Sequence, residues 1–338
     1  MQPELRLVIE LLKKSPNAKI INSCSKIIDK NKFLFLCAEF PIEDIIKRAE
    51  HYLSRDMVLS LNKTLFITRI KKNMLIQSTT EITKAFNKNG IKFIILKGFA
   101  YPELIKTRRT SDIDFLIKPQ TLNKCLQVLK SFGFVNNDKR SEYYFRTFSY
   151  HLNMHLKSNP EITIEPHWQI APKFFPAHID SNTLWRQSKK KNIYGQNVRV
   201  LSNEHNIIHL SLHALYQSAL STPFRDIYII SKIVSEKRID WNALAEDALV
   251  WKINNFVYFS LFLAQKYFKA RIPSSTLLKL KKKNFQYFMI QIMLPKKLAV
   301  IRTKKYTLDD FLCEMMFANL RNKLNIIKRI IYAIRNET

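Results

Sequence analysis

Two carboxylates stand one residue apart in the short apolar segment DIDFLI, at Asp112 and Asp114. In an extended strand, residues i and i+2 project from the same face, so these side chains lie next to each other. Their charges repel, and a fold accepts them on a buried strand face only where a cation lies between them. Because magnesium prefers oxygen ligands, the pair is suited to bridge this metal to the phosphates of a nucleotide.

A third carboxylate and a glycine turn strengthen this interpretation. Glu165 lies in the segment ITIEPHW, which we predict to be a neighbouring strand, where it would complete a site for two metal ions. Lys97 and Gly98 form a turn after a predicted strand and before a predicted helix, so their backbone N–H groups can face phosphate. A lone Asp-x-Asp is common, but this combination is much less common and favours a metal site.

The elements that must position these residues form a short unit between two helical regions. Apolar runs predict strands, and an alternating segment predicts a further strand in a hairpin. The predicted strands are 92–96, 112–117, 148–157 and 162–168, and the predicted helices between them are 99–105 and 119–131. Apolar positions at three- and four-residue spacing indicate helices before and after this unit.

We therefore predict an α+β fold with a small mixed β-sheet. Residues 1–88 would form an N-terminal helical segment, 89–175 the core with the sheet, and 176–338 a C-terminal helical domain. The cleft between the sheet and the helices would take the nucleotide.

The composition excludes some classes and leaves one question open. Only 4 of the 338 residues are glycine, which argues against Rossmann and P-loop folds, because their phosphate loops need several. The net charge of +29 reflects either binding of nucleic acid, nucleotide or an anionic surface, or the coding bias of an AT-rich genome. Residues 269–338 hold 16 basic and 4 acidic side chains, so this end is the best candidate for contact with RNA.

Cysteine usage and hydropathy give an expected location. The cysteines at positions 24, 37, 125 and 313 show no C-x-x-C spacing, so we interpret them as buried thiols in a reducing cytoplasm. The longest apolar stretches, such as 256–264 and 285–294, are too short to span a bilayer, so we expect no transmembrane segment.

Several histidines have two interpretations. His167 either orients Glu165 or contacts the nucleotide, or it is a partly buried strand histidine bonded to its neighbour. His209 and His213, four residues apart on a predicted helix, either face the cleft or serve packing. The histidines at 151 and 155 share a strand face, but no other soft ligand accompanies them, which argues against zinc.

These motifs resemble those of the polymerase-beta-type nucleotidyltransferase superfamily. More specifically, they are similar to an uncharacterised bacterial nucleotidyltransferase family with an L-K-G turn, an R-x-x-D-I-D strand and a D/E-x-H-W strand. The matching segments here are Leu96-Lys97-Gly98, Arg109-Thr110-Ser111-Asp112-Ile113-Asp114 and Glu165-Pro166-His167-Trp168. Downstream, LHA at 212–214 and FRDI at 224–227 look like the family's helical part, where Arg225 and Asp226 would form an internal ion pair.

The resemblance implies a magnesium-dependent transfer of a nucleoside monophosphate from an NTP to a hydroxyl group, with release of pyrophosphate. The acceptor would be a small molecule or a peptide. The implied catalytic and metal-binding residues are Asp112, Asp114 and Glu165, with two Mg²⁺ ions, and the implied nucleotide-binding residues are Lys97, Gly98, Arg109 and His167. Arg109 is equally interpreted as a surface residue beside a loop.

Two departures from the superfamily pattern bear on these roles. The usual Gly-Ser turn is Lys97-Gly98 here, which removes a serine hydroxyl that would touch phosphate. The third carboxylate is Glu165 rather than aspartate, which suits both metal binding and a general base. The alternative function is a nucleic-acid-binding or tRNA-modifying protein that uses the same fold, with or without catalysis.

Overall fold

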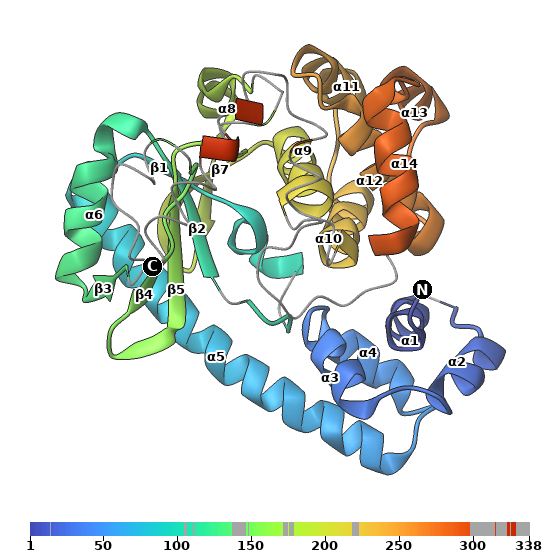
Figure 1. The fold of residues 1–338 in the computed structure, drawn as a ribbon. Helices are drawn as coiled ribbons and strands as arrows, with labels where there is room; N and C mark the ends of the chain where they lie inside the picture. The colour runs from blue at the N-terminus through green and yellow to red at the C-terminus, as the bar shows by residue number, and fades with distance from the viewer. Residues whose placement is uncertain are drawn as a thin grey trace.

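The fold is that of a computed structural model, in which a mixed β-sheet lies beside two groups of helices (Figure 1). The structure describes residues 1–297, apart from 14, 105–106, 111, 137–146, 148, 172–174, 176–178 and 218–222, together with 315, 323–324 and 326–328. Within this part of the chain, the α+β class predicted from the sequence is confirmed.

Within the described residues, seven strands form one sheet in the order β3-β4-β5-β2-β1-β7-β6. Their bounds are β1 Phe93–Ile95, β2 Asp112–Ile117, β3 Phe134–Val135, β4 Met154–Leu156, β5 Asn159–His167, β6 Lys189–Ile193 and β7 Gln196–Val200. β2 pairs in parallel with β5, and β1 pairs in parallel with β7, whereas all other neighbours are antiparallel. Because β1 and β2 are antiparallel, the last residue of β1 and the first residue of β2 lie at the same end of the strands.

The hairpin of β6 and β7 was not indicated by the sequence pattern. Tyr194 and Gly195 close it with φ angles of 50° and 77°, the left-handed conformation that two-residue hairpin turns require. Most of β6 is exposed at the edge of the sheet, so its lysine-rich sequence lacks the apolar alternation that marks a half-buried strand. Because β7 joins β1, the sheet extends to Val200.

The N-terminal helices pack around a core of their own. They are α1 Pro3–Leu12, α2 Ala18–Ser25, α3 Lys30–Ala38, α4 Ile42–Ala49 and α5 Arg55–Lys88. Side chains of Asn17, Asp29 and Ser54 accept backbone N–H groups in the first turns of α2, α3 and α5, as N-cap residues do. With 34 residues, α5 is about 50 Å long and reaches from these helices to the sheet (Figure 1).

The remaining helices lie on both sides of the sheet. They are α6 Leu122–Ser131, α8 Ser181–Gln187, α9 Asn203–Leu212, α10 Pro223–Glu236, α11 Trp241–Val250, α12 Asn254–Phe268, α13 Ser274–Leu280 and α14 Phe285–Lys297. Short helical turns are η1 Lys97–Ala100, η2 Pro102–Leu104, η3 Pro119–Thr121 and the π-helical η4 His213–Gln217. In the described part of the chain, no helix combines the length and the apolar character that crossing a membrane requires.

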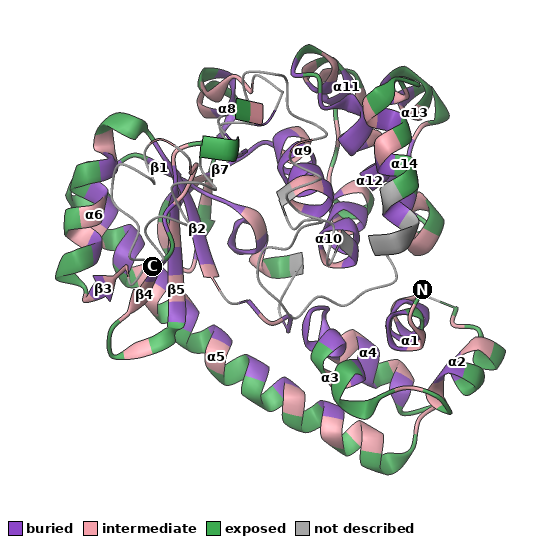
Figure 2. Cartoon of the chain, viewed as in Figure 1, coloured by how far each residue is buried: buried purple, intermediate pink, exposed green. Residues whose placement is uncertain are grey.

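Two apolar cores meet along α5 and α10. The larger core joins the sheet to α5, α6 and the C-terminal helices, and the smaller one joins α1–α4 to the first turns of α5 and α10. Burial follows this arrangement: the sheet is largely buried, whereas α5 is buried along one face only (Figure 2). The two cores hold the N-terminal helices against the unit that contains the acidic strands.

Three aromatic rings fill the space between α5 and the sheet. Phe86, Phe93 and Phe115 are at most 4% exposed, and their ring centroids are 5.4 Å apart in each pair. Such tilted and edge-to-face pairs stabilise a core beyond the area they bury. Phe115 stands on β2 one residue after Asp114, on the opposite face, so this packing fixes the strand that carries the aspartates.

We expect Phe115→Ala to lower the free energy of unfolding by about 3–5 kcal/mol, because a fully buried aromatic ring leaves a cavity. Urea denaturation followed by circular dichroism measures this loss. Phe66→Ala is the matched control, because Phe66 is 66% exposed on α5 and its removal is expected to change stability by less than about 0.5 kcal/mol. Equal effects of the two substitutions would contradict the packing role of Phe115.

Candidate active site

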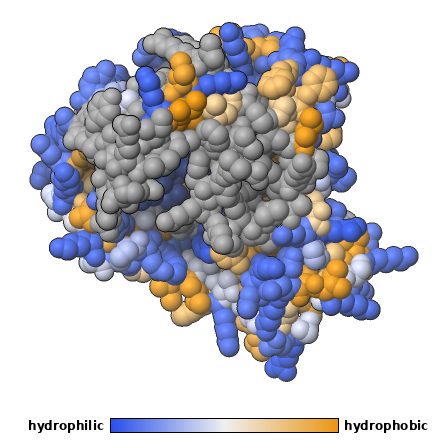
Figure 3. Space-filling model, in the orientation of Figure 1, coloured by the Kyte–Doolittle hydropathy of each residue, from blue (hydrophilic) through white to orange (hydrophobic). Residues whose placement is uncertain are grey.

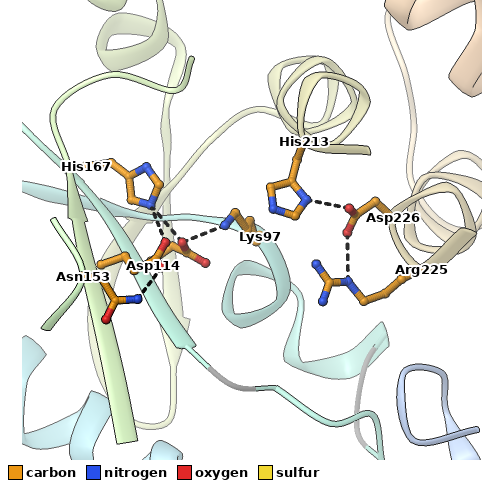
Figure 4. Close-up of polar contacts among 8 residues, drawn as sticks. Lys97, Asp114, Asn153, His167, His213, Arg225 and Asp226 are labelled. Carbon is orange, nitrogen blue, oxygen red and sulfur yellow. Dashed lines mark hydrogen bonds and ion pairs between the residues drawn. The ribbon is translucent and has the colours of Figure 1, made fainter. Parts of the chain in front are cut away.

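The register of two parallel strands brings the predicted acidic residues together. Asp114 on β2 stands opposite Glu165 on β5, and Asp112 stands opposite Thr163. Since paired residues of neighbouring strands share a face, all three carboxylates project from the same side of the sheet. This side faces the helices α9 and α10 (Figures 1 and 4).

Asp114 is a buried carboxylate held by two cationic partners. Lys97 Nζ lies 2.8 Å and His167 Nε2 lies 2.9 Å from the same oxygen, Oδ1 (Figure 4). A carboxylate only accepts, so His167 Nε2 carries the proton and donates it. Burial opposes the ionised form of Asp114, but Lys97 and the hydrogen bond from His167 outweigh it and hold the pKa of Asp114 well below its usual range.

Glu165 is ordered from both sides. Asn153 on the hairpin that precedes β5 donates from Nδ2 to Oε1 at 3.0 Å, and His167 Nε2 lies 3.4 Å from Oε2. Burial raises the pKa of Glu165, but the hydrogen bond from His167 and the charges of His151 and Lys97 together outweigh it and lower the pKa, so the side chain stays ionised. Carboxylate oxygens of Asp114 and Glu165 lie within 4.8 Å of each other and of a ring nitrogen of His167, so the two carboxylates are close enough to share one metal ion.

Asp112 is the carboxylate whose charge is least compensated. Burial and the neighbouring charge of Asp114 raise its pKa to about 6, although Lys97 acts in the opposite direction. Three carboxylates therefore share this face with one ammonium and one histidine. The oxygen donors and their excess negative charge fit a hard divalent cation such as magnesium.

The glycine turn before these residues has an unexpected backbone. The left-handed residue is Lys97, with a φ of 50°, rather than Gly98. This conformation costs a non-glycine residue about 1–2 kcal/mol, and it is accompanied here by the ion pair between Lys97 and Asp114. The backbone N–H of Leu96 also donates to the carbonyl of Asp114 at 3.0 Å, so turn and acidic strand are fixed to each other.

Arg109 is bound to the N-terminal helices. Its guanidinium pairs with Glu39, just after α3, and lies 4.4 Å from the ring centroid of Phe35. Its backbone N–H donates to the carbonyl of Ala38 at 2.7 Å. The role of Arg109 as a phosphate ligand stays a prediction, while its place in the structure is at the contact with α3.

The helices opposite the sheet contribute a second charged network. His213 Nδ1 lies 2.6 Å from Asp226 Oδ2, and Arg225 contacts both Asp226, at 3.4 Å, and Glu39, at 3.3 Å (Figure 4). The predicted ion pair of Arg225 and Asp226 is thus present. The contact of Arg225 with Glu39 connects the C-terminal helices to the N-terminal helices. Glu39 also binds Arg109, so the segment before β2 joins the same network.

Two further histidines, His209 and His151, are packed near the site. His209, one turn before His213, is completely buried, and neither ring nitrogen has a hydrogen-bond partner within the described residues. Burial holds the pKa of His209 well below its usual value, so it is neutral. His151 stacks on His167, with ring centroids 4.9 Å apart, and supports the position of that ring.

Two residues near the site were missed by the sequence analysis. Asn153 lies on the polar face of the segment 148–157, in which polar and apolar residues alternate. This local pattern could have predicted that Asn153 points to the same side as Glu165. Glu39 had none, because its partners Arg109 and Arg225 are 70 and 186 residues away in the chain. Contacts of this range arise only from the tertiary fold.

A strand with paired aspartates, a neighbouring acidic strand and a lysine-glycine turn together define the core of a nucleotidyltransferase. The chain belongs to the family described as uncharacterised nucleotidyltransferase, whose sequence profile matches residues 43–269. The match contains the turn, both acidic strands and the helices up to α12. The protein is therefore an enzyme of the nucleotidyltransferase class.

Two solved structures are similar to the chain at low sequence identity. The solution structure of the antibiotic-resistance factor ANT(2'')-Ia is 14% identical, with a TM-score of 0.37, over 58% of this chain and 97% of that one. The crystal structure of JHP933 from Helicobacter pylori is 17% identical, with a TM-score of 0.28, over 66% of this chain and 93% of that one. No curated protein matches the sequence.

We expect Asp226→Asn to destabilise the protein by about 3–5 kcal/mol, because it removes a buried carboxylate and leaves the half-buried Arg225 without one of its two carboxylate partners. Urea denaturation measures the change. Asp56→Asn is the matched control: Asp56 pairs with Lys30, both side chains are exposed, and solvent screens the pair, so we expect a small change in stability. A loss in Asp226→Asn no greater than in the control would show that this network does not hold the helices together.

Proposed function

We propose that the protein transfers a nucleoside monophosphate from an NTP to a hydroxyl-bearing small molecule or peptide, with magnesium as its metal. The observation that carries this proposal is the common face of Asp112, Asp114 and Glu165 on two parallel strands, beside the Lys97 turn. Carboxylates in this arrangement are the ligands that magnesium prefers.

Asp112, Asp114 and Glu165 would hold the metal. Bound there, magnesium would neutralise the phosphate oxygens and favour the ionised form of the acceptor hydroxyl. The residues of the chain supply the rest. Lys97 brings a permanent positive charge to the carboxylates and, with them, to the phosphates that they bind.

The proposed reaction is a substitution at the α-phosphorus. The acceptor oxygen forms a bond to the α-phosphorus, and the bond from this phosphorus to the bridging oxygen of pyrophosphate breaks. Pyrophosphate leaves with the electron pair, and the proton of the acceptor passes to Glu165. Glu165 suits this role because it is ionised and held in place by Asn153 and His167.

Two finer points stay proposals. Contact with RNA through residues 269–338 would make a tRNA a suitable acceptor, and most of the positions from 298 onward lie outside the described residues. We also propose a reducing, cytoplasmic location, for which the free and buried thiols of Cys24, Cys37 and Cys125 are suited.

We expect Asp112→Asn and Asp114→Asn each to lower nucleotidyl transfer by about 1,000-fold or more, equivalent to about 4 kcal/mol of transition-state stabilisation. The assay measures release of pyrophosphate from each of the four NTPs with a panel of acceptors, and mass spectrometry detects the added nucleotidyl group. EDTA should abolish the wild-type activity, and excess magnesium should restore it.

Asp56→Asn serves as the control for loss of a carboxylate, because Asp56 is exposed on α5, far along the chain from the acidic strands. Its activity should equal that of the wild type. Circular dichroism spectra of all variants confirm that they are folded. Unchanged transfer in both folded site variants would remove Asp112 and Asp114 from the mechanism.

A further inference from the structure

A pocket of about 500 Å³ opens beside the acidic face, where the N-terminal helices meet the sheet. This volume is within the range of small-molecule sites, about 300–1,000 Å³. Residues from four elements or their ends line it, including Phe35 and Glu39 at α3, Met74 on α5, Glu161 and Thr163 on β5, and Arg225 on α10.

One strand leads from this pocket to the carboxylates. Glu161, Thr163 and Glu165 alternate along β5 and therefore share a face. The first two line the pocket, and Thr163 stands directly opposite Asp112. A molecule in the pocket therefore contacts Thr163, the β5 residue opposite Asp112, although Asp112 itself is not among the lining residues.

The walls of the pocket combine an apolar side with a small excess of positive charge. Apolar groups are Phe35, Met74, Leu75, Pro160 and Ile162, and Arg109 lies over the Phe35 ring. The charged residues of the lining are three cations and two carboxylates. Lys71 pairs with Glu161, and Glu39 is shared by Arg109 and Arg225, so one positive charge is left without a carboxylate of its own. An apolar ligand body with one carboxylate complements these walls.

A buried polar atom in the lining has no partner in the described protein. Thr110 is 9% exposed, and its Oγ1 makes no hydrogen bond within the described residues. A buried hydroxyl without a partner costs about 1–3 kcal/mol, so such groups are normally satisfied by a ligand or by water. Thr110 precedes β2 by two residues, so the part of the pocket that it lines is close to Asp112 along the chain.

We propose that this pocket binds the acceptor, and that the acceptor is a hydroxylated organic acid with an apolar body about the size of an aromatic ring. The inference rests on the proposed transferase function, because it assigns the second substrate of the same site. The hydroxyl of the acceptor points toward Asp112, and its carboxylate lies near Arg109 and Arg225.

The proposal also identifies where acceptor preference originates. Phe35 and Glu39 precede residue 43, at which the family match begins. The helices before the family region therefore form one wall of the pocket. The choice of acceptor depends on this wall, while the acidic strands serve the transfer itself.

Binding of 3-(4-hydroxyphenyl)propanoate to the full chain tests the proposal without any need for turnover. Met74 is 39% exposed in the pocket, so its methyl signal in a ¹³C-methionine-labelled sample reports occupancy. We expect a saturable shift of the Met74 signal. Phe35→Ala should weaken this binding about tenfold, because a ring contact of about 1.4 kcal/mol is removed. Absence of any shift at 10 mM ligand would overturn the proposal.

Control variants and ligands separate the parts of this proposal. Phe66→Ala removes an exposed phenylalanine of α5 outside the pocket and should leave binding unchanged. The neutral 4-ethylphenol should bind more weakly than the acid, and the cationic tyramine more weakly still. Tyramine binding as tight as that of the acid would overturn the assignment of the carboxylate.

Parallel titrations with the magnesium complexes of the four NTPs distinguish failure of the pocket from failure of the proposed function. If any NTP binds and the acid does not, the acceptor proposal is wrong and the transferase proposal stands. If the acid shifts Met74 but none of the four NTPs binds, the transferase proposal fails and the pocket binds a ligand for another purpose. Equal losses of both ligands in Phe35→Ala would overturn a specific role of Phe35.

Discussion

The buried charge of Asp114 is the constraint on which the acidic site depends. A carboxylate that is 3% exposed is stable in its charged form only with cations close to it. Lys97, in the turn after β1, and His167, at the end of β5, are these cations. Lys97 reaches Asp114 from a left-handed turn, and His167 reaches it from β5 only in the observed parallel register. A shift of one residue in that register would turn both Glu165 and His167 to the other face of the sheet.

A second set of charges joins the three parts of the chain. Glu39 binds Arg109 before the acidic strand and Arg225 on α10, and Asp226 binds Arg225 and His213 within the C-terminal helices. Because Glu39 has partners on two other parts of the molecule, the network fixes orientation where apolar packing alone would tolerate sliding. Exposed apolar side chains lie on α5, such as Phe66 and Ile67, and also on α13 and α14, such as Leu278 and Phe285; Figure 3 shows apolar patches on the lower and on the upper side of the molecule.

The sequence predicted those features whose cause is local. Alternation placed Asp112, Asp114 and Glu165 on strand faces, and the strand at 112–117 was predicted at its observed bounds. The hairpin of β6 and β7 was missed, because an exposed edge strand needs no apolar pattern. The position of Arg109 and the role of Glu39 depend on contacts between segments far apart in the chain, which no local pattern encodes.

The parallel pairing of β1 and β7 also bears on how the protein is made. Ile94 pairs with Arg199, so β1 obtains its second neighbour only when a segment about 100 residues further along the chain has been synthesised. At a synthesis rate of about 5–20 residues per second, this interval is roughly 5–20 s on the ribosome. During that time β1 has a partner in β2 but an open edge on its other side, a surface to which other strands can bind. Protection of this edge in the nascent chain is therefore a requirement that the finished fold no longer reveals.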